Sequence, residues 1–189
     1  MSQKPNQSRV YHSAMPKGLI PLVAFLLAAF ASASAQNPFG PLPSACGPHE
    51  DSFDVKLDKS QHSLTQPEPG KARIYFIDDL GIVMGLRTPA EPMMLGIDGA
   101  WAGANHGNSY FSISVDPGIH HICAALRYYR EAKLVAVAQL QAEAGKTYFY
   151  RTRLIALQDP QYLQLDPVDP DEGGYLVASY PLSVSHPKK

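Results

Sequence analysis

Short apolar runs that alternate with polar residues and end at turn residues extend from residue 68 to residue 185. Ala72, Ile74 and Phe76 share one face of such a run. Asp98-Gly99 and Asp116-Pro117-Gly118 are sequences typical of tight turns, because Gly tolerates positive φ and Pro fixes the first turn position. Short strands separated by such turns are typical of all-β sandwiches and barrels. The sequence therefore predicts a single all-β sandwich of about seven or eight mostly antiparallel strands.

Two of the expected strands, Leu134–Ala142 and Lys146–Ile155, should pair as a hairpin around Ala144-Gly145. Residues 131–143 also have the Ala, Leu and Gln content of a helix, so strand and helix both remain open there, with the β-branched valines favouring a strand. The remaining strands are expected over residues 81–86, 93–97, 109–115, 118–126, 162–165 and 175–184, with 166–172 as an acidic turn.

The N-terminal segment has the pattern of an export signal. Basic residues precede the apolar run Leu19–Ala31, and the small residues Ala33-Ser34-Ala35 follow it. We expect cleavage between Ala35 and Gln36 and a periplasmic or secreted protein without stable membrane insertion. The alternative is an uncleaved signal anchor, since residues 18–35 approach the length of a membrane span, and the protein would then be tethered to the membrane.

This interpretation divides the chain into a signal peptide over 1–35, an arm over 36–67 and the sandwich domain over 68–185. The arm is rich in Pro and Ser and is expected to be extended linker. Phe53, Val55 and Leu57 alternate with polar residues, so one short strand is expected within it.

Charge argues against nucleic acid as a partner. Residues 1–35 carry three basic residues and no acidic ones, so the chain after cleavage has 13 basic and 17 acidic side chains. A mildly acidic protein with scattered Lys and Arg lacks the basic face that nucleic-acid binding requires.

The two cysteines, Cys46 and Cys123, are predicted to form a disulfide, because an even pair in an oxidising compartment is most simply paired. The bond would tie the Pro-rich arm to the sandwich. Two free thiols or a redox pair are the alternatives, although the chain has no Cys-x-x-Cys motif.

The turn sequences resemble a family of small bacterial exported domains catalogued only as a domain of unknown function, many of them periplasmic proteins or lipoproteins. The resemblance covers roughly residues 68–180 and also extends, more loosely, to PEGA-like β-sandwich modules. It rests on Ile97-Asp98-Gly99, Ser109-Tyr110-Phe111, Pro117-Gly118-Ile119-His120 and the run Ala144–Phe149. It implies a β-sandwich and no known reaction or ligand. This chain lacks the lipidation cysteine of such lipoproteins.

The candidate binding residues are Trp101, His106, Tyr128 and Tyr129. Residues 100–108 are predicted to form a flexible loop carrying the single tryptophan, and aromatic residues on loops commonly anchor sugars or protein partners. The alternative is that Trp101 packs into the core at the edge of the sandwich.

Metal binding has weak support in the sequence. His120 and His121 are adjacent in a predicted strand and point to opposite faces, so further ligands such as His106 or Asp116 would be needed. The acidic residues 166, 169, 171 and 172 lack the spacing of a calcium loop and are expected to form a solvated turn.

No motif for a nucleophile elbow, a zinc helix or a phosphate-binding loop occurs in the chain. We therefore expect a non-catalytic exported protein without a cofactor, an interaction or structural module of the cell envelope. Its partner would be an envelope protein or a glycan. The alternative function is a small-ligand or carbohydrate-binding protein that uses Trp101 with Tyr128 or Tyr129.

Overall fold

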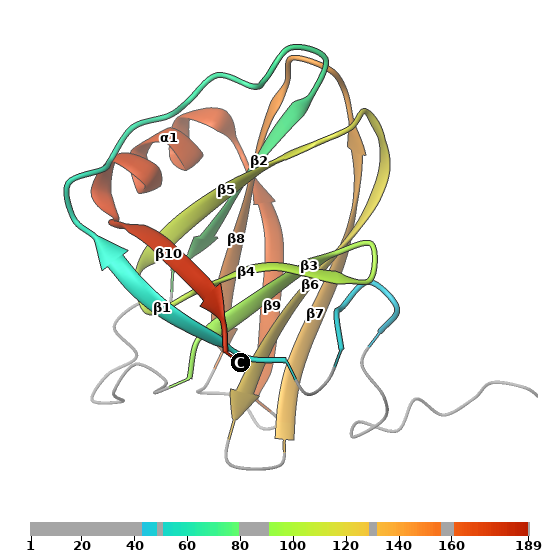
Figure 1. The fold of residues 1–189 in the computed structure, drawn as a ribbon, viewed down its shortest axis with the longest axis vertical. Helices are drawn as coiled ribbons and strands as arrows, with labels where there is room; N and C mark the ends of the chain where they lie inside the picture. Colours follow the sequence, from blue (N-terminus) through green and yellow to red (C-terminus); the bar gives the residue numbers. More distant parts are fainter. Residues whose placement is uncertain (1–42, 49–50, 80–90, 129–131, 156–160, 189) are drawn as a thin grey trace, which may run out of the picture. The chain divides into compact units, whose positions relative to one another are not determined.

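The computed structural model describes residues 43–48, 51–79, 91–128, 132–155 and 161–188, which all belong to the unit Phe39–Lys189. This part of the chain forms ten strands and one helix (Figure 1). Their bounds are β1 Phe53–Asp58, β2 Ala72–Asp78, β3 Met93–Ile97, β4 Ala100–Asn105, β5 Ser109–Val115, β6 Gly118–Tyr128, β7 Ala132–Ala142, β8 Thr147–Ile155, β9 Tyr162–Val168, α1 Pro170–Ser179 and β10 Leu182–Pro187. The strand predicted over 81–86 lies outside the described residues.

The strands form two sheets. One has six strands in the order β1-β10-β5-β2-β8-β9, and the other has four in the order β4-β3-β6-β7. Most neighbours are antiparallel, but β2 pairs with β8, and β10 with β5, in parallel. The prediction of a mostly β, two-sheet chain is confirmed. The described residues hold ten strands instead of seven or eight, and the six-stranded sheet is mixed.

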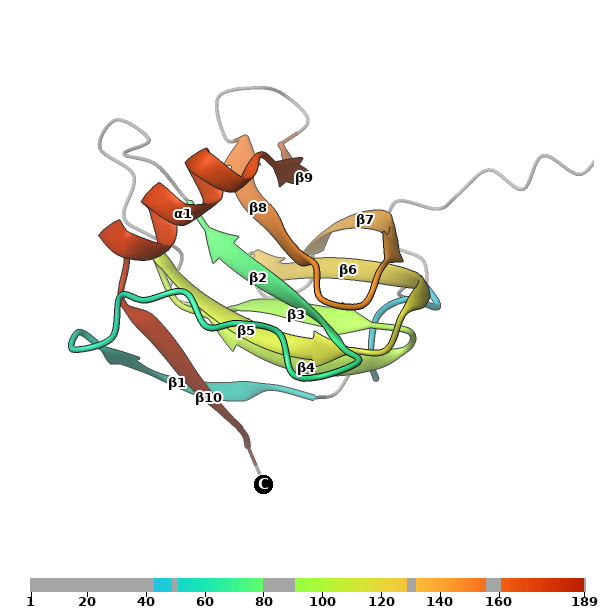
Figure 2. The ribbon, with the colours of Figure 1, turned by 90° about the horizontal axis from the view of Figure 1, so that it is seen from above.

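Strand β2 shows how alternation builds the layers. Ala72, Ile74 and Phe76 face the main core, which takes side chains from both sheets. Tyr75 and Ile77 face the other way and pack against α1. Figure 2 shows α1 on the opposite side of β2 and β8 from the four-stranded sheet. The six-stranded sheet is therefore buried on both faces at β2, and the near-continuous apolar run of this strand is typical of such a position.

The strand β7 confirms the strand interpretation of residues 131–143, but the expected hairpin with β8 is wrong. β7 pairs with β6, whereas β8 pairs with β2 and β9, so the chain crosses from one sheet to the other at Gly145. The backbone around this turn bonds to the start of β2: Gly145 N–H donates to Lys71 O over 2.8 Å, and Arg73 N–H donates to Lys146 O over 3.0 Å. These bonds place β8 beside β2.

The predicted acidic turn over 166–172 is wrong, and the strand predicted over 175–184 is right only from Leu182, where β10 begins. β9 continues to Val168, and α1 begins directly after Asp169. The Asp169 carboxylate caps the helix by accepting the backbone N–H groups of Asp171 and Glu172 over 3.0 and 2.9 Å. Pro170 occupies the first helical turn, where its missing N–H costs nothing.

Two short strands, β1 and β4, each form one edge of a sheet. The strand predicted around Phe53 is confirmed as β1, which pairs with β10. The Asp98-Gly99 hairpin is confirmed between β3 and β4, with both residues at positive φ. The predicted loop over 100–108 is wrong at its start, because Ala100–Asn105 forms β4. The small residues of β4 let this strand pack closely against Phe111, because a Cβ on Gly103 would lie only 3.1 Å from the Phe111 ring.

Hydroxyl groups join the two sheets along both sides. Tyr148 Oη accepts the Glu143 N–H over 3.0 Å, and Tyr150 Oη donates to Gln139 O over 3.3 Å, which satisfies backbone groups at the β7 edge. At the opposite edge, Ser185 Oγ accepts the Ala104 N–H over 3.1 Å. Unpaired edge groups invite association with other strands, so these bonds protect the edges.

Candidate functional site

Residues 43–48, here called the arm segment, lie against the outer face of the four-stranded sheet. The predicted disulfide between Cys46 and Cys123 is confirmed, with Cα atoms 5.1 Å apart. Both cysteines are buried in a small cluster with Ala45 and Ala125. Gly99 N–H donates to Ala45 O over 3.2 Å, so the arm segment is also bonded to the β3–β4 turn.

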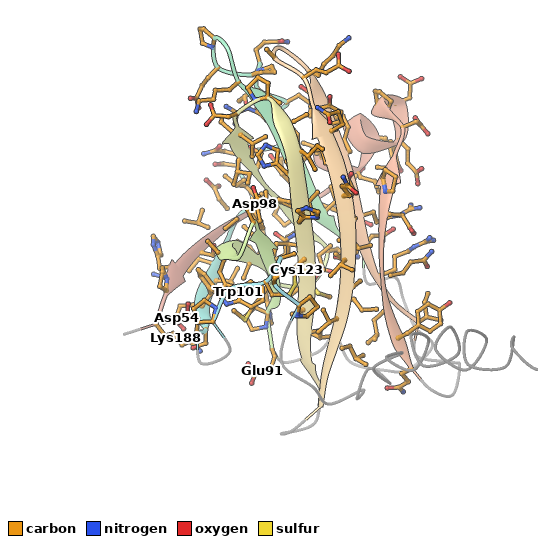
Figure 3. All side chains as sticks on the ribbon, turned by 90° about the vertical axis from the view of Figure 1, so that its right-hand side faces the viewer. Asp54, Glu91, Asp98, Trp101, Cys123 and Lys188 are labelled. Atoms are coloured by element: carbon orange, nitrogen blue, oxygen red, sulfur yellow. A yellow bond between two sulfur atoms is a disulfide. The ribbon has the colours of Figure 1, made fainter. Side chains whose placement is uncertain are left out.

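Trp101 lies on β4 beneath the arm segment, near Cys123 (Figure 3). Its indole N–H donates to Pro48 O over 2.7 Å. Gly47 is packed so closely against the ring that a Cβ there would lie 2.3 Å from the Trp101 Cδ1. The indole is half-buried and its polar atom already has a partner. A ligand that stacked on the face against Gly47 would have to displace the arm segment.

The same outer face is open to solvent beyond the arm segment. It carries Ile119 and His121 on β6 and Val137, Gln139 and Gln141 on β7, here called the β6–β7 face. Ile119 is 58% exposed and Val137 is 56% exposed, although both lie on regular strands. Val137 is directly across from Cys123, so the disulfide holds the arm segment next to this face. Apart from His121, none of the five side chains is ionisable.

The adjacent histidines separate as the strand geometry predicts. His121 is exposed on the β6–β7 face, whereas His120 is turned toward Asp98 and Asp116. His120 Nδ1 is 2.6 Å from an Asp98 carboxylate oxygen, and its Nε2 is 2.8 Å from the Asp116 backbone oxygen. Both ring nitrogens thus have hydrogen-bond partners. Among the described residues, no group of three or more His, Cys, Asp or Glu side chains is placed to hold a metal ion.

The acidic residues of β9 and of the start of α1 have separate roles. Asp169 caps α1, Asp166 pairs with Arg153 over 3.1 Å, and Glu172 pairs with Arg151. Arg151 also lies 3.8 Å from Asp79, whose other oxygen accepts the Tyr180 hydroxyl over 2.9 Å. The carboxylates are therefore distributed among structural contacts around α1.

The remaining candidate binding residues are His106, Tyr128 and Tyr129. His106 follows β4, and its backbone N–H donates to Ser109 Oγ over 3.2 Å, while its Nδ1 is buried without a hydrogen-bond partner. The side chain of Tyr128 and all of Tyr129 lie outside the described residues.

A layer of buried polar side chains closes one end of the core next to His106. It consists of Asp78, Asn105, Ser109, Thr152 and Ser183. Thr152 Oγ1 donates to the Asp78 carboxylate over 3.3 Å, and Asn105 donates to Phe76 O over 3.1 Å, which leaves the Asn105 Oδ1 without a partner. Burial, with a further contribution from the nearby Asp79 charge, raises the pKa of Asp78 well above its usual value despite the Thr152 bond. This carboxyl group is therefore neutral over a wider pH range than an exposed one.

Replacing Asp78 by Asn should stabilise the protein at neutral pH. In the unfolded chain, Asp78 ionises near its ordinary pKa of 3.8, whereas in the folded chain its pKa is higher. The free energy of unfolding of the wild type therefore falls as the pH rises from 3.8 through the folded pKa. Asn keeps an oxygen for Thr152 and does not ionise. We expect D78N to gain on the order of 1 kcal/mol at pH 7 and to match the wild type near pH 3, as measured by urea unfolding at both pH values. A gain of the same size at both pH values would contradict this explanation.

The sequence interpretation missed the two most exposed apolar residues of the β6–β7 face. Ile119 shares a strand face with His121 and Cys123, and Val137 shares one with Gln139 and Gln141. The alternation that predicted the strands contains this signal, since His121 is the next residue after Ile119 on its face and Gln139 is the next after Val137. What alternation could not supply was the pairing of β6 with β7, which brings both residues to one surface.

Comparison with known proteins found no matching family model, no matching curated protein and no matching solved structure. The resemblance to exported domains of unknown function thus stays a prediction. In the described part of the chain, no helix has the length and apolar character needed to cross a membrane. The disulfide fits an oxidising compartment.

Proposed function

We propose that this chain is an exported, non-catalytic β-sandwich protein that acts as a contact module in the cell envelope, with the β6–β7 face as its contact surface. The observation that supports this assignment most directly is the exposure of Ile119 and Val137 among the five side chains of the β6–β7 face, of which only His121 is ionisable. Single exposed apolar residues are ordinary on soluble proteins. Two on one sheet face, with glutamines beside them, have the composition of a protein contact surface, in which charged residues are depleted.

The anchoring of this surface also supports the proposal. The face lies on the two longest strands of the four-stranded sheet, and the disulfide fixes the arm segment beside it. A contact surface on paired strands loses little conformational entropy when it binds, because its backbone is already ordered. The β6–β7 face therefore needs no rearrangement to meet a partner.

The non-catalytic assignment is supported by how the described polar groups are used. Arg151, Arg153 and Glu172 form ion pairs around α1, and both ring nitrogens of His120 have partners. A catalytic site requires a nucleophile or an acid–base pair directed at a substrate. The sugar-binding alternative through Trp101 has less support, because Gly47 and Pro48 contact the indole.

Site-specific photocrosslinking tests the proposal. A benzophenone amino acid at position 137 should crosslink one envelope protein from a native envelope extract, whereas the same probe at position 184 should not. Val184 is a matched control because it is also a partly exposed valine on a strand, 38% exposed on β10. Burial of an unpaired lysine ammonium in an interface costs several kcal/mol even after the surroundings relax. V137K should therefore reduce recovery of that protein about 10-fold or more.

The V184K variant provides the corresponding binding control, because it adds the same charge to a different strand. Equal recovery by the wild type and V137K would reject the β6–β7 face as the contact surface. Crosslinking of equal strength from positions 137 and 184 would indicate nonspecific adhesion and would likewise reject it.

A further inference from the structure

His120 bridges two turns that are far apart in the sequence. Asp98 belongs to the turn between β3 and β4, and Asp116 precedes β6 at the end of β5. The His120 ring lies between them, with Nδ1 at 2.6 Å from Asp98 Oδ2 and Nε2 at 2.8 Å from Asp116 O. Both partners are acceptors only, since a carboxylate and a backbone carbonyl have no proton to give. Only the doubly protonated imidazolium can donate to both.

A neutral His120 cannot keep this geometry. It has one N–H group, so one ring nitrogen would present a lone pair to an oxygen at less than 3 Å. Either the Asp98 bond or the Asp116 bond must then be lost. The His120 side chain is mostly shielded, with a side-chain exposure of 14%, so water replaces the lost bond less readily than at the surface.

The charges around this ring favour the protonated form. Burial alone would lower the pKa of His120, but the Asp98 hydrogen bond, the Asp116 carbonyl and the negative charges of both carboxylates outweigh it and raise that pKa above 6.5. Lys71 opposes this effect in part, since its Nζ lies 2.7 Å from the Asp116 carboxylate. The pKa of Asp98 is lowered: burial acts against ionisation, but bonds from the His121 N–H and the His120 ring prevail.

The β3–β4 turn is also the attachment point of the arm segment. Asp98 and Gly99 both have positive φ, and Asp98 Oδ1 accepts the His121 N–H over 2.8 Å. Gly99, the next residue, donates its N–H to Ala45 O over 3.2 Å. A shift of this turn therefore reaches the arm segment and Trp101, which bonds to Pro48.

We infer that Asp98, His120 and Asp116 form a pH-dependent latch, which holds the β3–β4 turn and the arm segment in place while His120 is protonated and loosens them when it loses its proton. This inference does not depend on the proposed contact function. Histidine is the side chain whose charge changes near neutrality, so the latch would respond to the pH around the protein.

The direction of the effect on stability follows from the raised pKa. The latch contributes fully below pH 6.5, where His120 is protonated in the folded and unfolded chains. As pH rises through the folded pKa, the folded protein also loses the proton and the contribution disappears. The turn and arm should therefore be more mobile at alkaline pH.

Trp101 provides a direct readout, because it is the only tryptophan and it contacts the arm segment. We would titrate the oxidised protein from about pH 5 to about pH 9 and follow Trp101 emission together with exchange of the Gly99 amide. As the pH rises, the wild-type Trp101 emission should shift to the red. The Gly99 amide exchange rate should increase by more than base catalysis alone explains, and both changes should share a midpoint above pH 6.5. H120Q should show no such transition, while the other histidines remain in both proteins.

A second variant keeps the test decisive if H120Q folds poorly. D98N keeps an oxygen for the His121 N–H, and Asn tolerates positive φ as Asp does. It removes the negative charge that faces His120, so the midpoint should fall by about one pH unit. A flat wild-type titration would overturn the latch. The same transition in H120Q, or an unchanged midpoint in D98N, would assign the titration to another group and would also overturn it.

Discussion

Replacing Cys46 and Cys123 by alanine is expected to lower the free energy of unfolding by about 4 kcal/mol. The bond closes a loop across a sequence separation of 77 residues. In the chain-entropy model, opening a loop of this size raises the entropy of the unfolded chain, and at room temperature this stabilises the unfolded state by about 4 kcal/mol. Both cysteines are buried, so the alanines also leave apolar contacts incomplete. Urea unfolding of the wild type and the double variant would measure the difference.

Loss of the bond should also release the arm segment locally. Without the disulfide, the bonds from Gly99 to Ala45 and from Trp101 to Pro48 are the described hydrogen bonds from the arm segment to the sheet. Each contributes about 1 kcal/mol net, which is comparable to the entropic cost of ordering a single residue. Trp101 emission should therefore shift to the red in the folded double variant. A stability loss below about 1 kcal/mol with unchanged emission would show that packing alone holds the arm segment.

The sequence predicted strands better than it predicted their partners. Alternation placed β2, β5, β7 and β8 close to their observed bounds, because side-chain period depends only on local geometry. The β7–β8 hairpin failed because a turn sequence reverses the chain without determining the sheet that receives the next strand. That choice depends on the bonds of Gly145 and Lys146 to β2, which are distant in sequence.

Helix α1 was not predicted, although the sequence contains one local signal for it and one against it. Asp169 as cap, Pro170 in the first turn and acidic residues after it are typical of a helix start. The following Gly173-Gly174 pair argues against a helix, since each glycine costs up to about 1 kcal/mol relative to alanine. Packing decides the outcome, because Leu176 and Val177 bury themselves against the six-stranded sheet.

The candidate site was predicted in part. The disulfide followed from compartment and cysteine count, and both histidines were expected on opposite faces of one strand. The neighbours of Trp101 and His120 were not predictable, since the arm segment and the Asp98 turn reach them through contacts between distant parts of the chain. The exposed residues Ile119 and Val137 became a common surface only through the β6–β7 register.

The two adjacent glycines of α1 should respond in opposite ways to alanine. A Cβ on the buried Gly173 would lie 2.3 Å from Phe149 Cγ, and that ring stacks on Tyr75 at 5.2 Å between centroids. Overpacking of this kind costs typically about 1–3 kcal/mol, so G173A should lose about 2 kcal/mol. A Cβ on Gly174 would meet only Leu64 Cδ1, at 3.7 Å. G174A should therefore gain about 0.5–1 kcal/mol from helix propensity.

Thermal unfolding of both variants tests this difference, since 1 kcal/mol shifts the midpoint of a domain of this size by about 2–4 °C. G174A serves as the control for the general effect of alanine in α1. Phe149→Leu adds a second check, because a smaller side chain leaves room for the methyl group that G173A introduces. The cost of F149L should be smaller in the G173A background than in the wild type, since residues in contact are energetically coupled. Additive effects, or equal stability of G173A and G174A, would show that α1 does not dock on the sheet through Gly173.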